Sequence, residues 1–335
     1  MLLTTAEVAS VSRRISLEPL HNKRIAITGG TGMVGSYLVE ALCRSFEIQG
    51  VEPLEIRIIS GSMNFSSISH LRNYKYLIFH DQPLERVTKL NGFQILIHAA
   101  SPASPTQYPS FESLSAINSG ALSKLMSQDI EKTLFISSGE VYGSEAPNPI
   151  DEEYKGIIDA KIARSSYPLA KLEAEEVGSQ VCSELGADFR IARLFHSFGP
   201  GMRENDGRSF ADFLWRAAEG AKPVLRSPGS DIRTFLYLED TIIALLIVLL
   251  HDQTLGAINV GSEVPFSILE FAKRVSWLSG NQGDLEFDFE QTHYIHSANK
   301  VIVPKTSRLC ELGWRQEIDL DAAIIKTLAW IKRRI

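Results

Sequence analysis

The feature that most constrains the fold is a glycine-rich turn that directly follows a short apolar run. Residues 24–27 read Arg-Ile-Ala-Ile, and residues 28–35 read Thr-Gly-Gly-Thr-Gly-Met-Val-Gly. A buried strand that ends in such a turn and continues into a helix is the first unit of a dinucleotide-binding βαβ fold, because the glycines permit a tight turn and close approach of a pyrophosphate. The helix N-terminus adds unpaired N–H groups and a positive dipole. The residues expected to bind the dinucleotide here are Gly29, Gly32, Met33, Val34 and Gly35.

Short apolar runs alternate with helical stretches as far as residue 195. Strands are expected at 24–27, 56–59, 76–79, 95–98, 133–137 and 189–194, and helices include 34–46 and 111–128. This alternation predicts an α/β fold, a doubly wound parallel (Rossmann) sheet with helices on both faces. We expect an N-terminal extension over residues 1–20, an NAD(P)-binding Rossmann domain over 21–195, and a smaller substrate domain over 196–335 that is partly interleaved with the first.

A second motif lies halfway along the chain, where Tyr167 precedes Lys171 on an expected helix. Residues four apart on a helix share one face. A tyrosine has an ordinary pKa of about 10, so it needs nearby positive charge to act as a base at neutral pH. Lys171 and an oxidised nicotinamide supply that charge. Tyr167 is therefore the expected base that deprotonates a substrate alcohol while hydride leaves for the nicotinamide.

The fifth strand ends in Ser138 and Glu140, which are the other expected catalytic residues. Ser138 would lie at the carboxyl edge of the sheet, where its hydroxyl can bond the reacting oxygen and relay its proton. Ser137 is expected to be structural, and so is His98 at the end of the fourth strand.

The residues after the second strand do not decide between NAD and NADP. An acidic residue at this strand end binds the ribose 2′-OH of NAD, whereas residues 60–64 here read Ser-Gly-Ser-Met-Asn. We expect NAD, with NADP not excluded. Asp81, just after the third strand, is a candidate for contact with the adenine amino group.

Composition excludes several classes of protein. The chain has 335 residues, a net charge of −6 and 44% hydrophobic content, without a long basic run, so nucleic acid is not an expected partner. Three dispersed cysteines indicate neither a disulfide framework nor a metal site, and favour a reducing cytoplasm. The longest apolar stretch, residues 242–250, is too short for a bilayer, so no membrane association is expected and the stretch indicates a buried helix. Residues 1–20 lack the pattern of a signal peptide.

These motifs, together with 98–101 (His-Ala-Ala-Ser) and 198–200 (Phe-Gly-Pro), resemble the extended short-chain dehydrogenase/reductases that modify nucleotide sugars. The resemblance runs from about residue 23 through nearly the whole chain. Within that group, segments 100–105, 140–143, 164–167 and 205–208 are most similar to UDP-glucuronate decarboxylases, and next to dTDP-glucose 4,6-dehydratases.

The resemblance implies an NAD-dependent epimerase, dehydratase or decarboxylase that acts on a UDP- or dTDP-linked hexose and forms a homodimer through helices 111–128 and 167–185. It implies that Tyr167 and Lys171 also contact the cofactor, and that Asn118 is a structural residue of the active-site helix. The further cofactor residues that it implies are Ala99, Ala100 and Ser101. The substrate-binding residues that it implies are Ser104, Arg164, His196, Arg208 and Arg233, of which Arg233 matches a contact to the diphosphate or the reacting carboxylate.

Two departures from the family pattern bear on the product. Decarboxylases carry Ser, and dehydratases an Asp proton donor, where this chain has Gly139, so Glu140 is the remaining acid–base group there. His196 replaces the usual Asn of an Arg-x-x-Asn segment, and either a phosphate contact or a structural role fits it.

The sequence thus predicts an enzyme that oxidises a hexose at C4 and acts through a 4-keto intermediate, closest to UDP-glucuronate decarboxylase. A nucleotide-sugar 4-epimerase or 4-keto reductase is the nearest alternative, because neither needs a donor at residue 139. A non-catalytic dinucleotide-binding scaffold or sensor is the alternative from another class.

Overall fold

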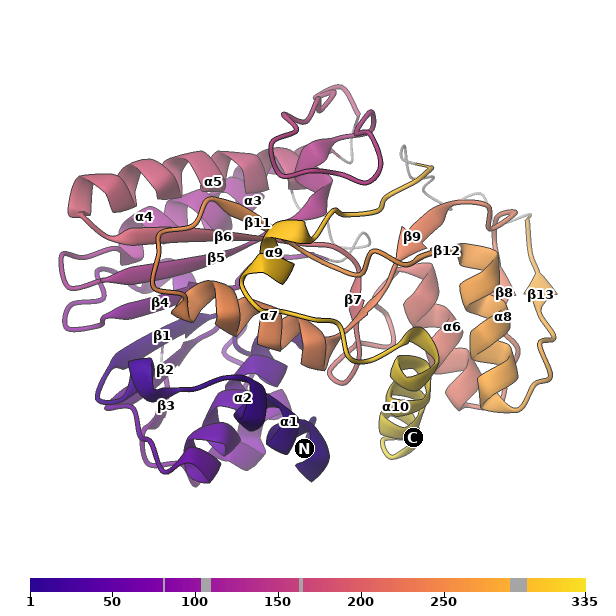
Figure 1. The fold of residues 1–335 in the computed structure, drawn as a ribbon, viewed down its shortest axis with the longest axis horizontal. Helices are drawn as coiled ribbons and strands as arrows, with labels where there is room; N and C mark the ends of the chain where they lie inside the picture. The colour runs from indigo at the N-terminus through magenta and orange to yellow at the C-terminus, as the bar shows by residue number, and fades with distance from the viewer. Residues whose placement is uncertain (81, 104–109, 163–164, 290–299) are drawn as a thin grey trace.

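The structure, a computed structural model, describes residues 1–80, 82–103, 110–162, 165–289 and 300–335. Its centre is a seven-stranded sheet with the order β11-β6-β5-β4-β1-β2-β3, and every neighbouring pair is parallel (Figure 1). This confirms the predicted doubly wound parallel sheet. The strands are β1 (Arg24–Thr28), β2 (Glu55–Ile59), β3 (Leu77–Phe79), β4 (Ile95–His98), β5 (Lys132–Ser138), β6 (Asp188–Leu194) and β11 (Ala257–Val260).

Helices cover both faces of this sheet, which is why its central strands are almost continuously apolar. One set comprises α2 (Met33–Gln49) and α7 (Leu238–Leu250), which contact each other, and α7 also contacts β5, β6 and β11. The other set is α5 (Ser166–Leu185), which contacts β5 and β6, with α3 (Phe111–Ser115) and α4 (Ala121–Leu125) beside it (Figure 1). α7 contains the apolar stretch at 242–250, and nearly all of its residues are buried.

The helix expected over 111–128 is broken, and it ends earlier than predicted. A π-helical turn, η5 (Ala116–Gly120), separates α3 from α4, and α4 ends at Leu125, where Met126 takes an extended backbone conformation. Asn118 lies in this turn, and its Nδ2 donates to the carbonyl of Leu114 at 2.7 Å. A side-chain amide that bonds the backbone competes with the helical ladder, and π turns inside helices are frequent at functional sites.

Chain order reverses at β1, which pairs with β2 on one side and β4 on the other. A ligand of an open α/β sheet binds at the carboxyl ends of the strands beside such a switch point. The later part of the chain returns to the same sheet, because β11 pairs with β6.

A smaller helical layer follows residue 195 and stands beside the sheet, to the right in Figure 1. Its helices α6 (Ser209–Ala218), α8 (Ile268–Ser279) and α10 (Leu320–Lys332) pack on one another around a cluster of aromatic rings, in which Phe235 and Phe271 have ring centroids 4.3 Å apart. The other elements of this part are β7 (Ser197–Phe198), β8 (Val224–Leu225), β9 (Ile232–Thr234), β10 (Leu236–Tyr237), β12 (Pro265–Ser267), β13 (Glu286–Phe287) and α9 (Ser307–Glu311). The short helices of the sheet part are η1 (Glu18–Leu20), η2 (Ser66–Leu71), η3 (Leu84–Arg86) and η6 (Gly139–Tyr142).

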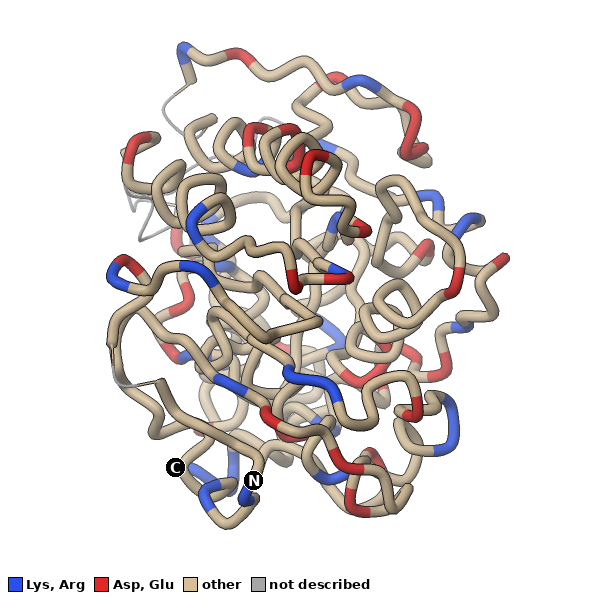
Figure 2. The backbone as a smooth tube through the Cα atoms, turned by 90° about the vertical axis from the view of Figure 1, so that its left-hand side faces the viewer, with Lys and Arg blue, Asp and Glu red and all other residues tan. Residues whose placement is uncertain are grey.

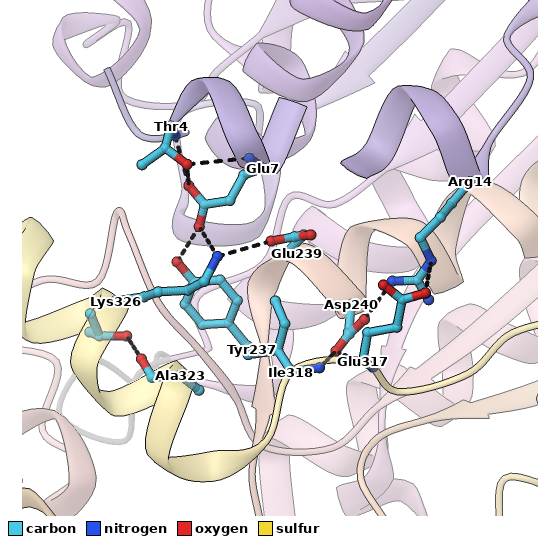
Figure 3. A network of polar contacts seen from close by, with 11 residues as sticks. Thr4, Glu7, Arg14, Tyr237, Glu239, Asp240, Glu317, Ile318, Ala323 and Lys326 are labelled. Atoms are coloured by element: carbon cyan, nitrogen blue, oxygen red, sulfur yellow. Dashed lines mark hydrogen bonds and ion pairs between the residues drawn. The ribbon is translucent and has the colours of Figure 1, made fainter. Parts of the chain in front are cut away.

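The N-terminal segment forms α1 (Thr5–Arg14), which packs on α2 and α7. Figure 3 shows how buried polar groups hold α1 in place. Glu7 accepts a hydrogen bond from the Tyr237 hydroxyl at 2.6 Å, and Lys326 of α10 lies 3.4 Å from the same carboxylate. Arg14 pairs with Asp240 at 2.8 Å. The segment thereby joins the sheet part to the helical layer.

Charges of both signs are interspersed over the backbone (Figure 2). Within the described ranges, no helix combines the length and the apolar character needed to cross a bilayer.

Candidate active site

A cleft of about 1110 Å³ opens at the carboxyl edge of the sheet, between the sheet and the helical layer. Its walls come from the turns that follow β1, β4, β5 and β6, from the start of α5, and from residues 201–233. The predicted residues that line it are Gly29, Gly32, Met33, Val34, Gly35, Ala99, Ser101, Ser138, Glu140, Tyr167, Lys171, His196, Arg208 and Arg233.

The glycine turn is closely packed. A side-chain Cβ at Gly35 would lie 2.2 Å from the carbonyl oxygen of Gly29, so only glycine lets α2 start this close to the turn. Gly29 has a φ of +67°, and a Cβ there would lie 2.6 Å from the backbone nitrogen of Ala100. Ala100 itself is outside the cleft lining; it lies behind the turn, and its N–H donates to the Thr28 hydroxyl at 3.2 Å.

The N-terminus of α2 faces the cleft and has no side-chain cap. Gly32 is the N-cap residue, and a Cβ there would meet a single atom within 4 Å, the Gly29 carbonyl oxygen at 3.4 Å. The hydroxyl oxygen of Ser101 is buried beside this cleft without a partner among the described residues. An uncapped helix start, open space at Gly32 and an orphaned hydroxyl together fit a dinucleotide diphosphate.

The end of β2, where the sequence lacks the acidic residue that binds a ribose, carries hydroxyl groups instead. Ser60 follows β2, is buried, and its Oγ lies 3.1 Å from Thr31 Oγ1 of the glycine turn and 3.3 Å from Ser62 Oγ. These hydroxyls tie the end of β2 to the glycine turn.

Tyr167 and Lys171 both lie in the first turns of α5 and are buried at the cleft. The Lys171 Nζ donates to the Ile136 carbonyl at 2.7 Å, stands 4.7 Å from the Phe135 ring centroid and is 6.0 Å from the Tyr167 ring centroid. Burial lowers the pKa of Lys171 to about 7, and the Glu175 carboxylate opposes that shift. The pair has the arrangement in which an ammonium lowers the pKa of a phenol.

Ser138 is the last residue of β5 and also the N-cap of η6, where its Oγ accepts the N–H of Glu140 at 3.2 Å. Ser137 points to the other side of the strand and donates to Glu175 at 2.5 Å. Both serines line the cleft, and the bond from Ser137 to Glu175 also holds α5 against the strand.

A buried ion pair supports the base of the cleft. Arg193 of β6 bonds the Glu175 carboxylate through Nε (3.1 Å) and Nη2 (2.6 Å), and its Nη1 donates to the Tyr142 hydroxyl at 3.0 Å. Tyr142 in turn donates to Asn259 of β11 at 2.6 Å. This network links α5, η6, β6 and β11 at the sheet edge, and the sequence alone gave no signal that these residues belong together.

Two arginines line the opposite wall. Arg208 pairs with Asp206, and its guanidinium stacks 4.9 Å from the Phe210 ring centroid. Arg233 is buried; its Nη1 donates to the carbonyls of Ile232 (2.7 Å) and Lys300 (3.2 Å). His196 also lines the cleft, with its ring against Phe210 and Phe235.

His98 and Asn118 lie behind the site. The His98 Nδ1 is 2.8 Å from Thr28 Oγ1, its Nε2 is 3.1 Å from the Ile117 carbonyl, and burial lowers its pKa to about 3. A neutral ring with both nitrogens bonded fits a structural role. The Oδ1 of Asn118 is buried without a partner among the described residues.

Three predicted residues, Asp81, Ser104 and Arg164, lie outside the described residues. Across the ranges that are described, no group of three or more His, Cys, Asp or Glu side chains is placed to hold a metal ion.

Phe195 and Ile302 also line the cleft and were missed by sequence reasoning. Apolar side chains in a segment between strand and loop are typical of the hydrophobic core, and no local sequence pattern indicates that these two line a site.

A parallel sheet with a glycine turn at its switch point, an uncapped helix start and a buried Tyr–Lys pair in one cleft define a dinucleotide-dependent oxidoreductase site. The model of the NAD dependent epimerase/dehydratase family matches residues 25–261. The chain therefore belongs to the NAD-dependent epimerase/dehydratase family, which confirms the predicted membership of the extended short-chain dehydrogenase/reductases, the prediction of an enzyme and the prediction of NAD.

Among relatives, UDP-glucuronic acid decarboxylase 1 of Xenopus tropicalis is 28% identical over 325 residues, which cover 93% of this chain and 73% of that protein. UDP-glucuronic acid decarboxylase 3 of Arabidopsis thaliana is 30% identical over 307 residues, covering 89% of this chain and 86% of the relative. Among solved structures, a UDP-N-acetylglucosamine 4-epimerase from Methanobrevibacter ruminantium M1 has a TM-score of 0.79 at 22% identity, covering 94% of this chain and all of that one. That last likeness bears on the fold.

Proposed function

We propose that this chain is a nucleotide-sugar enzyme that oxidises a hexose at C4, acts through the 4-keto sugar, and is closest in activity to UDP-glucuronate decarboxylase. The observation that carries the proposal is the meeting of Tyr167, Lys171 and Ser138 in one cleft with the open start of α2. The names of the relatives described above support the same assignment.

The cofactor would be held by the chain's own backbone at the glycine turn. The N–H groups of Met33, Val34 and Gly35 would receive the diphosphate, and the Ser101 hydroxyl would take a further contact. When bound, NAD accepts a hydride from the C4 carbinol and later returns it.

Tyr167 takes the proton of the C4 hydroxyl. Lys171 lies beside the phenol, and in its protonated form its charge favours the phenolate. Ser138, whose hydroxyl also lines the cleft, bonds the reacting oxygen and keeps it in line with the phenol.

The C4 ketone then activates the neighbouring carbon. A carboxylate on C5 becomes a β-keto acid, which loses CO2 readily because the electron pair of the broken bond enters the carbonyl. Glu140, at the turn after β5, stands where it can orient the sugar or move a proton at C5. Tyr167 can return its proton to the C4 oxygen at the end of the cycle.

The helical layer would hold the nucleotide. We propose that residues 196–335 act as the substrate part and that Arg208, Arg233 and His196 face the diphosphate or the sugar acid, since guanidinium groups pair with phosphate and carboxylate in two-pronged fashion. Pairing of α3 and α5 with a second copy would give a homodimer. The three cysteines are free thiols, which supports a cytoplasmic location.

The experiment is to incubate the purified protein separately with UDP-glucuronate, UDP-glucose and dTDP-glucose. Release of CO2 from UDP-glucuronate is the expected result. A 4-epimer without CO2 would favour the epimerase, for which the absence of a side chain at Gly139 is the supporting observation. Retention of bound NAD without turnover of any of the three sugars would favour the scaffold.

A further inference from the structure

Gly139 and Phe195 stand next to each other at the edge of the sheet that forms the cleft floor. Ser138 of β5 is in register with Leu194 of β6, so the residues that follow these two leave the sheet side by side. Gly139 begins η6, while the Phe195 N–H donates to the Val260 carbonyl at 2.9 Å and continues the sheet pairing.

The Phe195 ring occupies the space that a side chain at residue 139 would need. A Cβ on Gly139 would lie 2.9 Å from both Cε1 and Cζ of the ring, which is closer than real Cβ contacts. At the other end of the same side chain, a Cβ on Gly261 would lie 2.9 Å from Phe195 Cβ. Two glycines therefore make room for one phenylalanine.

The ring is also fixed in its position. Phe195 is 6% exposed and belongs to a buried cluster with Val141, Ile150 and Ile302. It stacks on Tyr142 with ring centroids 6.2 Å apart and an interplanar angle of 29°. Because Tyr142 is held by Arg193 and Asn259, the ring cannot swing away at small cost.

Phe195 consequently makes the part of the cleft wall next to Gly139 apolar. Phe195 and Ile302 both line the cleft, and the η6 turn contributes Glu140 as its one ionisable side chain in the lining. Arg233 also lines the cleft, where it pairs with Asp231 at 3.3 Å.

This wall distinguishes between two reactions of a 4-keto sugar. Loss of the C6 hydroxyl as water requires a base to take the C5 proton and an acid to protonate the leaving hydroxyl. Loss of a C5 carboxylate requires neither: the C5–C6 bond breaks, its electron pair enters the C4 carbonyl, CO2 leaves, and C5 then takes one proton from water. A carboxylate beside an apolar ring is also poorly solvated, whereas CO2 is neutral, so the wall favours this step.

We propose that Phe195 is a specificity-determining residue that commits the site to hexuronates, whose C5 carboxylate leaves as CO2, and against 4,6-elimination from neutral hexoses. This inference rests on the proposed C4 oxidation and names the residue that selects the product.

The test compares the wild type with Phe195→Gln and Phe195→Leu, which shorten the ring similarly but differ in polarity. Each protein is mixed with UDP-glucuronate or UDP-glucose, and three signals are followed: absorbance of the reduced cofactor at C4 oxidation, CO2, and 4-keto-6-deoxy sugar. Thermal unfolding and NAD binding verify that each variant is folded.

We expect the wild type to release CO2 from the hexuronate and to form no 4-keto-6-deoxy sugar from the hexose. We expect the rate of CO2 release to be at least about tenfold lower in Phe195→Gln than in Phe195→Leu, while the cofactor is still reduced in both variants. Equal CO2 release by the two variants overturns the inference. Formation of 4-keto-6-deoxy sugar by the wild type also overturns it, and this second test needs no folded variant. Cofactor reduction with neither sugar contradicts the proposed function itself and the inference with it.

Discussion

Glu175 and Arg193 form a two-pronged ion pair, with 2.6 Å between Oε2 and Nη2, directly behind the catalytic face of α5. Glu175 lies one helical turn beyond Lys171, and its other contact is the Ser137 hydroxyl. The pair therefore fixes α5 against β5 and β6 and places a carboxylate near the buried lysine.

Replacing Glu175 with Gln should destabilise the fold strongly, because Arg193 would keep a buried charge without its counter-ion. We expect a loss of about 3 kcal/mol in the free energy of unfolding, measured by urea denaturation. The exposed neighbour Glu176→Gln is the matched control and should change stability by less than about 0.5 kcal/mol. Equal stabilities of the two variants would show that the pair contributes little.

Lys171 should make stability depend on pH in a defined window. Its pKa falls from 10.5 to about 7 on burial, so between these values the unfolded chain binds the proton and the folded chain does not. Stability from this group is therefore lost as the pH falls from about 10 to about 7, and the loss is complete below the folded pKa. Lys171→Met cannot bind that proton. In nucleotide-free protein, the stability of this variant relative to the wild type should therefore rise as the pH falls from about 10 to about 7. A difference that is flat from pH 7 to pH 10 would contradict the assigned pKa shift.

Two glycines of the turn should respond differently to alanine. Gly35→Ala places a methyl group 2.2 Å from the Gly29 carbonyl oxygen and should destabilise the fold by at least about 2 kcal/mol. Gly32→Ala meets little protein, so it should leave the unfolding free energy within about 1 kcal/mol and weaken NAD binding at least about tenfold. Thermal unfolding and titration calorimetry separate the two effects, and unchanged NAD affinity in Gly32→Ala would place the diphosphate elsewhere.

The N-terminal helix should be held by Glu7. Glu7→Ala leaves the Tyr237 hydroxyl without its acceptor and Lys326 without one of its carboxylates (Figure 3), and we expect a loss of about 2 kcal/mol. Because the contacts of Glu7 lower its pKa, this contribution is present above the ordinary pKa of 4.5 and is lost as the pH falls further. The exposed Glu18→Ala serves as control, and equal urea midpoints for the two variants at pH 7 would refute the role of Glu7.

Local sequence patterns were sufficient to predict the strands of the first half of the sheet. β1, β4 and the glycine turn have patterns typical of buried strands and a phosphate-binding turn, and the predicted bounds of the two strands differ from the observed ones by no more than one residue. The π turn at Asn118 was not predicted because it depends on one side-chain amide bonding the backbone. β11 could not be assigned to this sheet, because four residues carry too little pattern to specify a partner strand.

The same contrast holds for the site. Tyr167 and Lys171 were found because their spacing has a chemical meaning. The wall formed by Phe195 was not, because it requires two glycines from distant parts of the chain, at 139 and 261, to meet one ring. The sequence showed that residue 139 had lost its side chain, and the structure shows what fills the space.

The most direct test of the account is the fate of the hydrogen at C4. UDP-glucuronate labelled with deuterium at C4 should be converted to CO2 and a UDP-pentose that keeps its deuterium at C4. The label should slow the reaction measurably, as a kinetic isotope effect, and the bound cofactor should be oxidised again after each turnover. Appearance of the label in water, or of a sugar product without deuterium at C4, would contradict oxidation and re-reduction at that carbon.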